Sequence, residues 1–166
     1  MFRFIRLIAV VLAASAAVTM PALAQKADAL ANLDRDLAKL RACYSPLNAG
    51  CVIDTMPPDI LKIAGGKEAL VGLMESTLKT LAEGDTKAQF DQVVHTPDKA
   101  TSKLGDKLFV KVLQKYPVRL QGKDGHLSGA LVAISTDEGE SWKFADASSK
   151  DAFEQFFPGA WDLLKV

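Results

Sequence analysis

The stretch KLFVKVLQKYPVRLQGKDGHLSGALVAIS, residues 107–135, decides the fold of this chain. Its first part, Lys107–Leu120, is rich in Val, Leu, Phe and Tyr, which favour β-strands. A glycine-containing turn at 122–125 separates this part from a second apolar run at 127–135. Two strands joined by so short a turn pair antiparallel, so the stretch predicts a β-hairpin. Pro117 lacks a backbone N–H donor and marks an edge or a bulge in the first strand.

The octet STDEGESW, residues 135–142, follows the second strand directly. Its Ser135, Asp137, Gly139 and Trp142 have the spacing of the Asp-box, and the octet resembles that motif of sialidase propeller blades. A propeller repeats its blades about every 40–50 residues, and this chain has no internal repeat. We therefore interpret the octet as a structural turn, in which Asp137 accepts backbone donors and Gly139 takes a positive φ. A glycosidase is not predicted.

Shorter strands precede and follow this region. After Gly84 the apolar period changes from 3.6 residues to 2, which indicates strands. We predict a strand at 87–95, a turn at 96–99 and a short strand at 100–104. A last strand is predicted at 142–146, after the octet. Together with the hairpin, these segments form a meander of antiparallel strands.

Helices come before the predicted sheet. The first predicted helix ends near Cys43. It carries one apolar stripe at steps of three and four residues, formed by Leu30, Leu33, Leu37, Leu40 and Tyr44. Asp34 and Asp36 fall off this stripe, on the side expected to face solvent. A short helix is predicted at 58–64, where two prolines suit a helix start, and a longer one at 67–83.

The C-terminal region predicts one more short helix. Ser148 or Ser149 can cap it, Pro158 stops it, and an apolar packing tail follows at 159–166. Helices that are segregated from antiparallel strands indicate an α+β fold. We therefore expect one domain, residues 25–166, with N-terminal helices packed in a curved antiparallel sheet and a short C-terminal helix.

The first 24 residues have the layout of a secretory signal peptide. Arg3 and Arg6 form a basic start, an uncharged apolar run follows at 7–18, and small residues precede a cleavage site after Ala24. The apolar run is shorter than the roughly 20 residues that span a bilayer. An uncleaved membrane anchor is the alternative. We predict an exported protein of the periplasm, with no membrane attachment after cleavage.

The charge of the chain is balanced, with 20 basic and 20 acidic residues. Removal of Arg3 and Arg6 leaves 18 basic and 20 acidic residues, a net charge of about −2. The sequence shows no basic stripe of the kind that binds nucleic acid and no polybasic membrane patch. We expect neither partner.

The two cysteines, Cys43 and Cys51, flank a turn-rich segment of seven residues. An even pair around such a loop in an oxidising compartment indicates a disulfide. Metal ligands or a reactive thiol are the alternatives. The histidines that a metal site would need, His95 and His126, lie far along the chain. We predict no metal and no cofactor.

The order of elements resembles the nuclear-transport-factor-2-like superfamily, which includes polyketide-cyclase-like and ketosteroid-isomerase-like proteins. The stretch from Asp54 through Pro58 into Gly65-Gly66 and the strand–turn–strand at 131–146 carry the resemblance, which covers about 45–147. It implies a sheet that curls into a cone around the long helix, with a pocket at its wide end. It also implies dimerisation through the sheet in many members. In isomerase-type members a carboxylate base works with a tyrosine donor.

Three side chains are candidates for the pocket of such a cone: Asp54, His95 and Tyr116. Asp54 or His95 would act as a general base, and Tyr116 would place a hydroxyl inside. Each also has a structural interpretation that stays open. Asp54 would then cap a turn or helix, His95 would be hydrogen-bonded at a strand end, and Tyr116 would be a core or edge aromatic.

Three functions compete at this point. The first is an exported small-molecule-binding or accessory protein that holds a small apolar or amphipathic ligand in the cone without catalysis. The second is an interaction module that forms a homodimer or binds a partner through its sheet. The third is an isomerase-, cyclase- or dehydratase-like enzyme. The sequence contains no catalytic constellation such as a Gly-x-Ser-x-Gly elbow or a phosphate loop, so we rank binding first.

Overall fold

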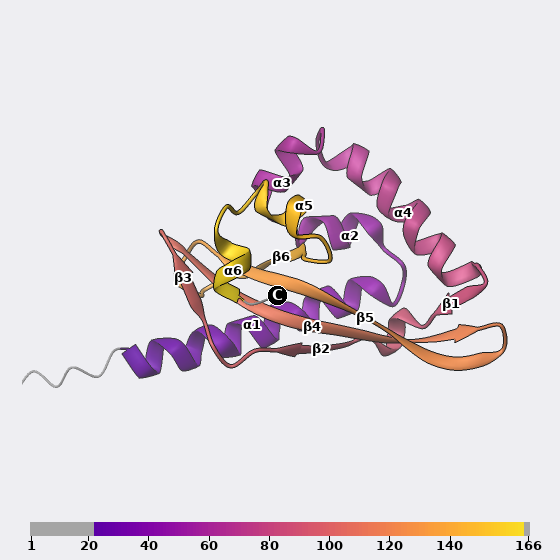
Figure 1. Ribbon diagram of the computed structural model, residues 1–166, viewed down its shortest axis with the longest axis horizontal. Helices are drawn as coiled ribbons and strands as arrows, with labels where there is room; N and C mark the ends of the chain where they lie inside the picture. Colours follow the sequence, from indigo (N-terminus) through magenta and orange to yellow (C-terminus); the bar gives the residue numbers. More distant parts are fainter. Residues whose placement is uncertain (1–21, 165–166) are drawn as a thin grey trace, which may run out of the picture.

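The computed structural model describes residues 22–164 (Figure 1). The helices are α1 (Ala22–Tyr44), α2 (Ala49–Asp54), α3 (Pro58–Ile63), α4 (Lys67–Glu83), α5 (Lys150–Glu154) and α6 (Ala160–Leu164). The strands are β1 (Thr86–Ala88), β2 (Val94–Pro97), β3 (Ser102–Leu104), β4 (Lys107–Leu120), β5 (Lys123–Ser135) and β6 (Lys143–Asp146), and the 3₁₀ turn η1 (Phe90–Gln92) separates β1 from β2. Residues 1–21 of the predicted signal peptide lie outside the described residues, and the predicted cleavage site after Ala24 falls in the first turn of α1.

The β4–β5 hairpin is the centre of the sheet. These two strands pair antiparallel over their whole length, from Leu108 opposite Ser135 to Leu120 opposite Lys123. The other edge of β4 pairs in succession with β3, β2 and β1, and β5 pairs with β6. The sheet curls strongly into a half-barrel, so the predicted α+β fold with a cone-like antiparallel sheet is confirmed.

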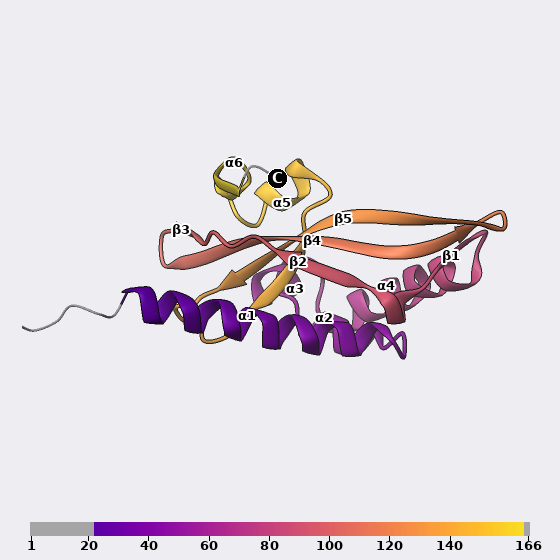
Figure 2. The ribbon, with the colours of Figure 1, turned by 90° about the horizontal axis from the view of Figure 1, so that it is seen from below.

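Each face of the sheet packs on its own set of helices. Figure 2 shows α1 on one side of the strands and α5 and α6 on the other. The inner core joins α1 and α2 to the inward-facing side of the strands. Its members include Leu33, Leu37 and Leu40 of α1, Val52 of α2, and Val112, Val118 and Ala133 of the strands. The outer core joins the opposite strand positions to the C-terminal helices through Phe109, Val132, Ile134, Phe153 and Phe157. Each fully buried side chain of this size stabilises the fold by roughly 1.5–3 kcal/mol.

The helices follow the signals in the sequence. The stripe of α1 is buried from Leu33 to Tyr44, and α4 has the bounds that the pattern predicts. Ser149 caps α5 by accepting a hydrogen bond from the Ala152 N–H. A further helix, α2, was not predicted. Asn48 starts it by accepting the Cys51 N–H at 2.9 Å, a capping signal three residues before the second cysteine.

The octet at 135–142 forms the turn between β5 and β6 and docks on α1. Ser135 Oγ accepts the Gly139 N–H at 2.8 Å, and Asp137 Oδ1 accepts the Ser141 N–H at 3.0 Å. The Trp142 indole N–H donates to the Ala29 carbonyl at 3.0 Å and is buried. The octet therefore stabilises its own turn by internal hydrogen bonds, and Trp142 joins the turn between β5 and β6 to α1.

Asp36 is the main correction to the predicted surface of α1. The sequence placed it on the solvated side, but its side chain is buried against the octet. Its carboxylate accepts the Trp142 backbone N–H at 3.0 Å, Lys39 Nζ at 2.7 Å and Arg35 Nε at 3.0 Å. Arg35 also donates to the Glu140 carbonyl at 2.8 Å. The octet packs on this face of α1, so Arg35 and Asp36 of the helix contact the octet instead of solvent alone.

Two predicted segments differ from the observed strands. The strand predicted at 87–95 is interrupted by η1, where the chain crosses from one position along β4 to the next. The strand β2 then extends into the predicted turn at 96–99 and ends at Pro97. The hairpin turn lies at Gln121 and Gly122, with φ of 49° and 80°, instead of at 122–125. Both positive φ values suit a two-residue hairpin loop, which extends both strands.

Candidate functional site

A cavity of about 220 Å³ opens between the inner face of the sheet and the helices α1, α2 and α4. We call it the cone pocket. Its walls are mainly apolar and include Leu40 of α1, Val52 and Met56 near α2, Leu78 of α4 and Leu131 of β5. In Figure 1, α2 lies between α1 and α4, so the helices enclose the side that the sheet leaves open. An apolar cavity of this kind is typical of sites for small molecules.

Aromatic rings form one wall of the cone pocket. The rings of Tyr44 and Phe90 stack with centroids 5.9 Å apart, and those of Phe90 and Tyr116 lie 5.6 Å apart with tilted planes. Phe144 of β6 also lines the cavity. The helix stripe brings Tyr44 to this wall, and the alternation of β4 brings Tyr116.

The polar groups of the cone pocket come from separate elements. Tyr44 ends α1, Gln114 and Tyr116 occupy successive inward positions of β4, and Asp146 ends β6. The Asp146 carboxylate accepts the Ser148 N–H at 2.9 Å and also the Ser148 hydroxyl, which fixes the carboxylate at the end of its strand. Asp146 is exposed, so it lies where the cavity meets solvent.

Both tyrosine hydroxyls of the cone pocket stay protonated at neutral pH. Burial raises the pKa of Tyr44 to about 12. Repulsion from Asp146, and from Tyr116 once it is ionised, adds to this, and a hydrogen bond from Gln114 opposes it. Burial, followed by the charge of Asp146, also raises the pKa of Tyr116. The hydroxyls can therefore donate and accept hydrogen bonds but do not act as phenolates.

Of the three predicted pocket residues, Tyr116 lines the cavity and the other two do not. His95 lies behind the wall, where its ring stacks on Tyr44 at 6.2 Å and its Nε2 is 3.2 Å from Gln114 Oε1. Burial lowers the pKa of His95 to about 4, so the imidazole is neutral at physiological pH. His95 can orient Gln114 but does not reach the cavity.

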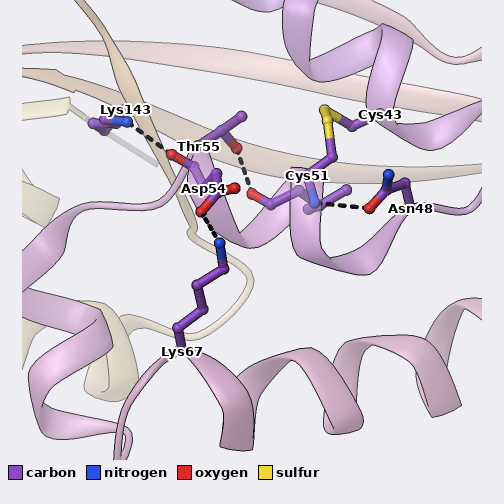
Figure 3. The surroundings of a disulfide bond; sticks show 8 residues. Cys43, Asn48, Cys51, Asp54, Thr55, Lys67 and Lys143 are labelled. Atoms are coloured by element: carbon purple, nitrogen blue, oxygen red, sulfur yellow. Dashed lines mark hydrogen bonds and ion pairs between the residues drawn. A yellow bond between two sulfur atoms is a disulfide. The ribbon is translucent and has the colours of Figure 1, made fainter.

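Asp54 lies on the other side of α2, outside the cone pocket. Its carboxylate pairs with Lys67 Nζ at 2.5 Å and its backbone carbonyl accepts Lys143 Nζ at 2.7 Å (Figure 3). Asp54 is the last residue of α2, and its side chain is exposed to solvent. It borders an open groove of about 480 Å³ beside the disulfide. Asp54 is therefore corrected from a pocket residue to a surface ion pair.

The disulfide joins Cys43 at the end of α1 to Cys51 in α2, with Cα atoms 5.4 Å apart. The bond lies against the start of the short helix that Asn48 caps (Figure 3). Since α2 contributes Val52 to the wall of the cone pocket, the disulfide holds a pocket element to the long helix. Within residues 22–164, no group of three or more His, Cys, Asp and Glu side chains could hold a metal ion.

Asp146, Tyr44, Gln114 and Phe144 are pocket residues that the sequence did not single out. Phe144 and Asp146 share one face of the predicted last strand, so alternation alone pairs a buried aromatic with a carboxylate. Tyr44 continues the stripe of α1. The sequence does not show that the ends of α1 and β6 meet, because this depends on the curl of the sheet.

Comparison with protein-family models gives no match, and comparison with curated proteins gives none either. The resemblance to the nuclear-transport-factor-2-like superfamily therefore stays a prediction, and the site is interpreted from its own geometry. No helix within residues 22–164 is long and apolar enough to cross a membrane.

Proposed function

We propose that this chain is an exported small-molecule-binding or accessory protein whose ligand occupies the cone pocket. The observation that carries the proposal is an apolar cavity with its hydrogen-bonding groups gathered from three elements: Tyr44, Gln114, Tyr116 and Asp146. Apolar walls supply affinity for the body of a ligand, and a few placed polar groups fix its orientation. The mature protein would begin at Gln25 and act in the periplasm, where the disulfide is stable.

A blocking variant tests this proposal. Thr77 lies on α4, is exposed and lines the cone pocket, so Thr77→Trp would fill the cavity from its surface side. Ser76→Trp adds the same ring to the neighbouring exposed position, which does not line the cavity. Protein from the periplasmic fraction should begin at Gln25 by intact mass. Native mass spectrometry should find a bound small molecule in the wild type and in Ser76→Trp but not in Thr77→Trp.

Two results would overturn the proposal. One is protein that carries no small molecule and shows no saturation transfer in NMR from any member of a panel of small aromatic and aliphatic probes. The other is binding that Thr77→Trp leaves unchanged, since the ligand would then lie elsewhere. Both tryptophan variants must keep the far-ultraviolet circular dichroism of the wild type.

An enzyme is the second candidate, because a carboxylate and a tyrosine hydroxyl line the same cavity. Asp146 would be the base and Tyr116 the donor, in place of the predicted Asp54 and His95. Asp146 is exposed, and a hydrated carboxylate is a weaker base than a desolvated one. The reporter 5-nitrobenzisoxazole releases a coloured phenolate when a base removes its proton. An increase in this rate that Asp146→Asn abolishes would favour the enzyme over the binding protein.

A further inference from the structure

The charge of the cone pocket restricts which ligands it can take. Among the described residues that line it, Asp146 alone carries a charge, and the lining includes no lysine, arginine or histidine. A carboxylate or phosphate ligand would face this carboxylate without a neutralising cation, which is costly in a mainly apolar site. Anionic amphiphiles such as fatty acids are therefore poor candidates.

Three side chains that line the cone pocket offer oxygen atoms that accept hydrogen bonds. Asp146 contributes a carboxylate, and Tyr44 and Tyr116 contribute neutral hydroxyls. Asp146 and both tyrosines line the same cavity, and the charge of Asp146 contributes to the raised pKa of each tyrosine. A single carboxylate in an otherwise uncharged lining favours a ligand with positive charge. A primary ammonium group has three N–H donors, which match three acceptor oxygens.

The walls suit the rest of such a ligand. Tyr44, Phe90, Tyr116 and Phe144 offer aromatic rings, whose faces attract cations as well as apolar groups. Leu78 and Leu131 complete an apolar lining. A cavity of about 220 Å³ limits the ligand to a small molecule, such as an amine with one ring or a short chain.

On this basis we infer that the cone pocket takes a small organic monocation, an ammonium group on an apolar or aromatic body, with the nitrogen at Asp146, Tyr44 and Tyr116. The inference rests on the proposed binding function and names the class of its ligand. The open groove beside the disulfide does not compete for such a ligand, since its Asp36 and Asp54 already pair with Lys39 and Lys67.

Three probes of similar size and different charge test the inference: phenethylammonium, 2-phenylethanol and 3-phenylpropionate. Calorimetry on the wild type should show that the ammonium binds at least roughly tenfold more tightly than the alcohol, as expected for a charge-assisted hydrogen bond. The carboxylate should bind most weakly. Added salt should weaken the binding of phenethylammonium and leave that of the other two probes nearly unchanged, because the ammonium is attracted electrostatically to a carboxylate that solvent reaches.

Asp146→Asn should reduce the affinity for phenethylammonium by roughly tenfold and leave that for the alcohol nearly unchanged. The asparagine keeps an oxygen that can accept from Ser148, so the turn after β6 is preserved. Asp54→Asn is the matched control, since it removes a carboxylate outside the cone pocket, and it should change neither affinity.

Equal binding of the ammonium and the alcohol, lost in Thr77→Trp, would overturn this inference and leave the proposed function standing. The same holds if Asp146→Asn and Asp54→Asn weaken the ammonium equally, because the effect would then be long-range. If none of the three probes binds and the purified protein carries no small molecule, both the inference and the proposed function fail.

Discussion

Asp36 shows how strongly one carboxylate can depend on its partners. Burial by itself would raise its pKa, but hydrogen bonds from Arg35 and Lys39 and from the Trp142 N–H outweigh burial and lower the pKa of Asp36 to about 2. The side chain is 8% exposed. A buried charge held in this way favours the folded state, because the unfolded chain lacks these donors.

Asp36→Asn should lower the free energy of unfolding at pH 7 by about 2 kcal/mol, the equivalent of the drop in pKa from 3.8 to about 2. Because the folded pKa is the lower one, this contribution is complete above pH 5 or so and is lost as the pH falls through 3.8 towards 2. Urea denaturation of both proteins across this range measures the difference. Asp34→Asn, an exposed neighbour, should show little effect; a constant difference down to pH 2 would contradict the assignment.

Gly139 is the second residue with a sharp expectation. A Cβ at this position would lie 2.4 Å from Ala29 Cβ, and the residue has a φ of +93°. Gly139→Ala should therefore lower the free energy of unfolding by about 1–3 kcal/mol or more, by pushing the octet off α1. Gly105→Ala is the control, since Gly105 also has a positive φ but open space around it. Equal thermal shifts for the two variants would mean that the contact with Ala29 is unimportant.

At the scale of elements, local signals predicted the helices better than the short strands. The stripe of α1 and the bounds of α4 follow from spacing and flanking glycines, which act within one or two turns. The strand predicted at 87–95 was broken by η1, because its residues pair with different positions along one long strand. The helix α2 was missed because its six residues are too few to show a period.

Local sequence signals also predict only part of the candidate site, because they do not show which distant segments come together. Tyr116 was predictable, since it alternates with apolar inward-facing residues on a long strand. Asp54 was misplaced because the sequence does not show which side of α2 faces the sheet. The sequence shows that Asp146 shares a strand face with Phe144, but it does not show that Asp146 lines one cavity with Tyr44 and Tyr116, because this depends on how the sheet curls.

The link between α1 and α2 gives a prediction at the scale of elements. Reducing the disulfide, or changing both cysteines in Cys43→Ser/Cys51→Ser, should lower the free energy of unfolding by about 2.5 kcal/mol on the chain-entropy argument. Urea denaturation with and without dithiothreitol measures this for the wild type. The double variant is its control and should not respond to the reductant. An unchanged wild type in reductant would show that Asn48 and the packing of α2 suffice.

At the scale of the whole molecule, the outer face of the sheet bears on the predicted homodimer. Beyond α5 and α6 this face exposes Val94 and Leu113, at 58% and 51%. It also carries Lys115, Arg119 and Lys87, of which Arg119 pairs with Asp124. Two copies stacked through this face would bring their positive charges together. Dimerisation through the sheet would therefore depend on salt, because screening weakens this repulsion.

Light scattering at about 20 mM and about 500 mM salt tests this dependence, since the screening length falls several-fold between them. If the protein dimerises through this face, the fraction of dimer should be small at low salt and larger at high salt. Leu113→Lys should reduce this fraction. Leu73→Lys is the control, because Leu73 is also exposed but lies on α4. A dimer that dissociates with salt would use another surface.

The division of one sheet edge into three short strands has a consequence for aggregation. Sheets join to other chains through long, flat edges with unpaired backbone groups. Here β4 is internal, and the edge beside it consists of three strands of three or four residues, of which β2 ends in Pro97. On the other side, β6 pairs with residues 131–134 of β5, so within residues 22–164 no strand pairs with residues 123–129 on that side. A foreign strand would find no long continuous run of donors and acceptors beside β4, but it could pair with residues 123–129 of β5. Association with other chains through the sheet edge should therefore begin at this outer part of β5, and the edge of short strands beside β4 should stay free of added strands.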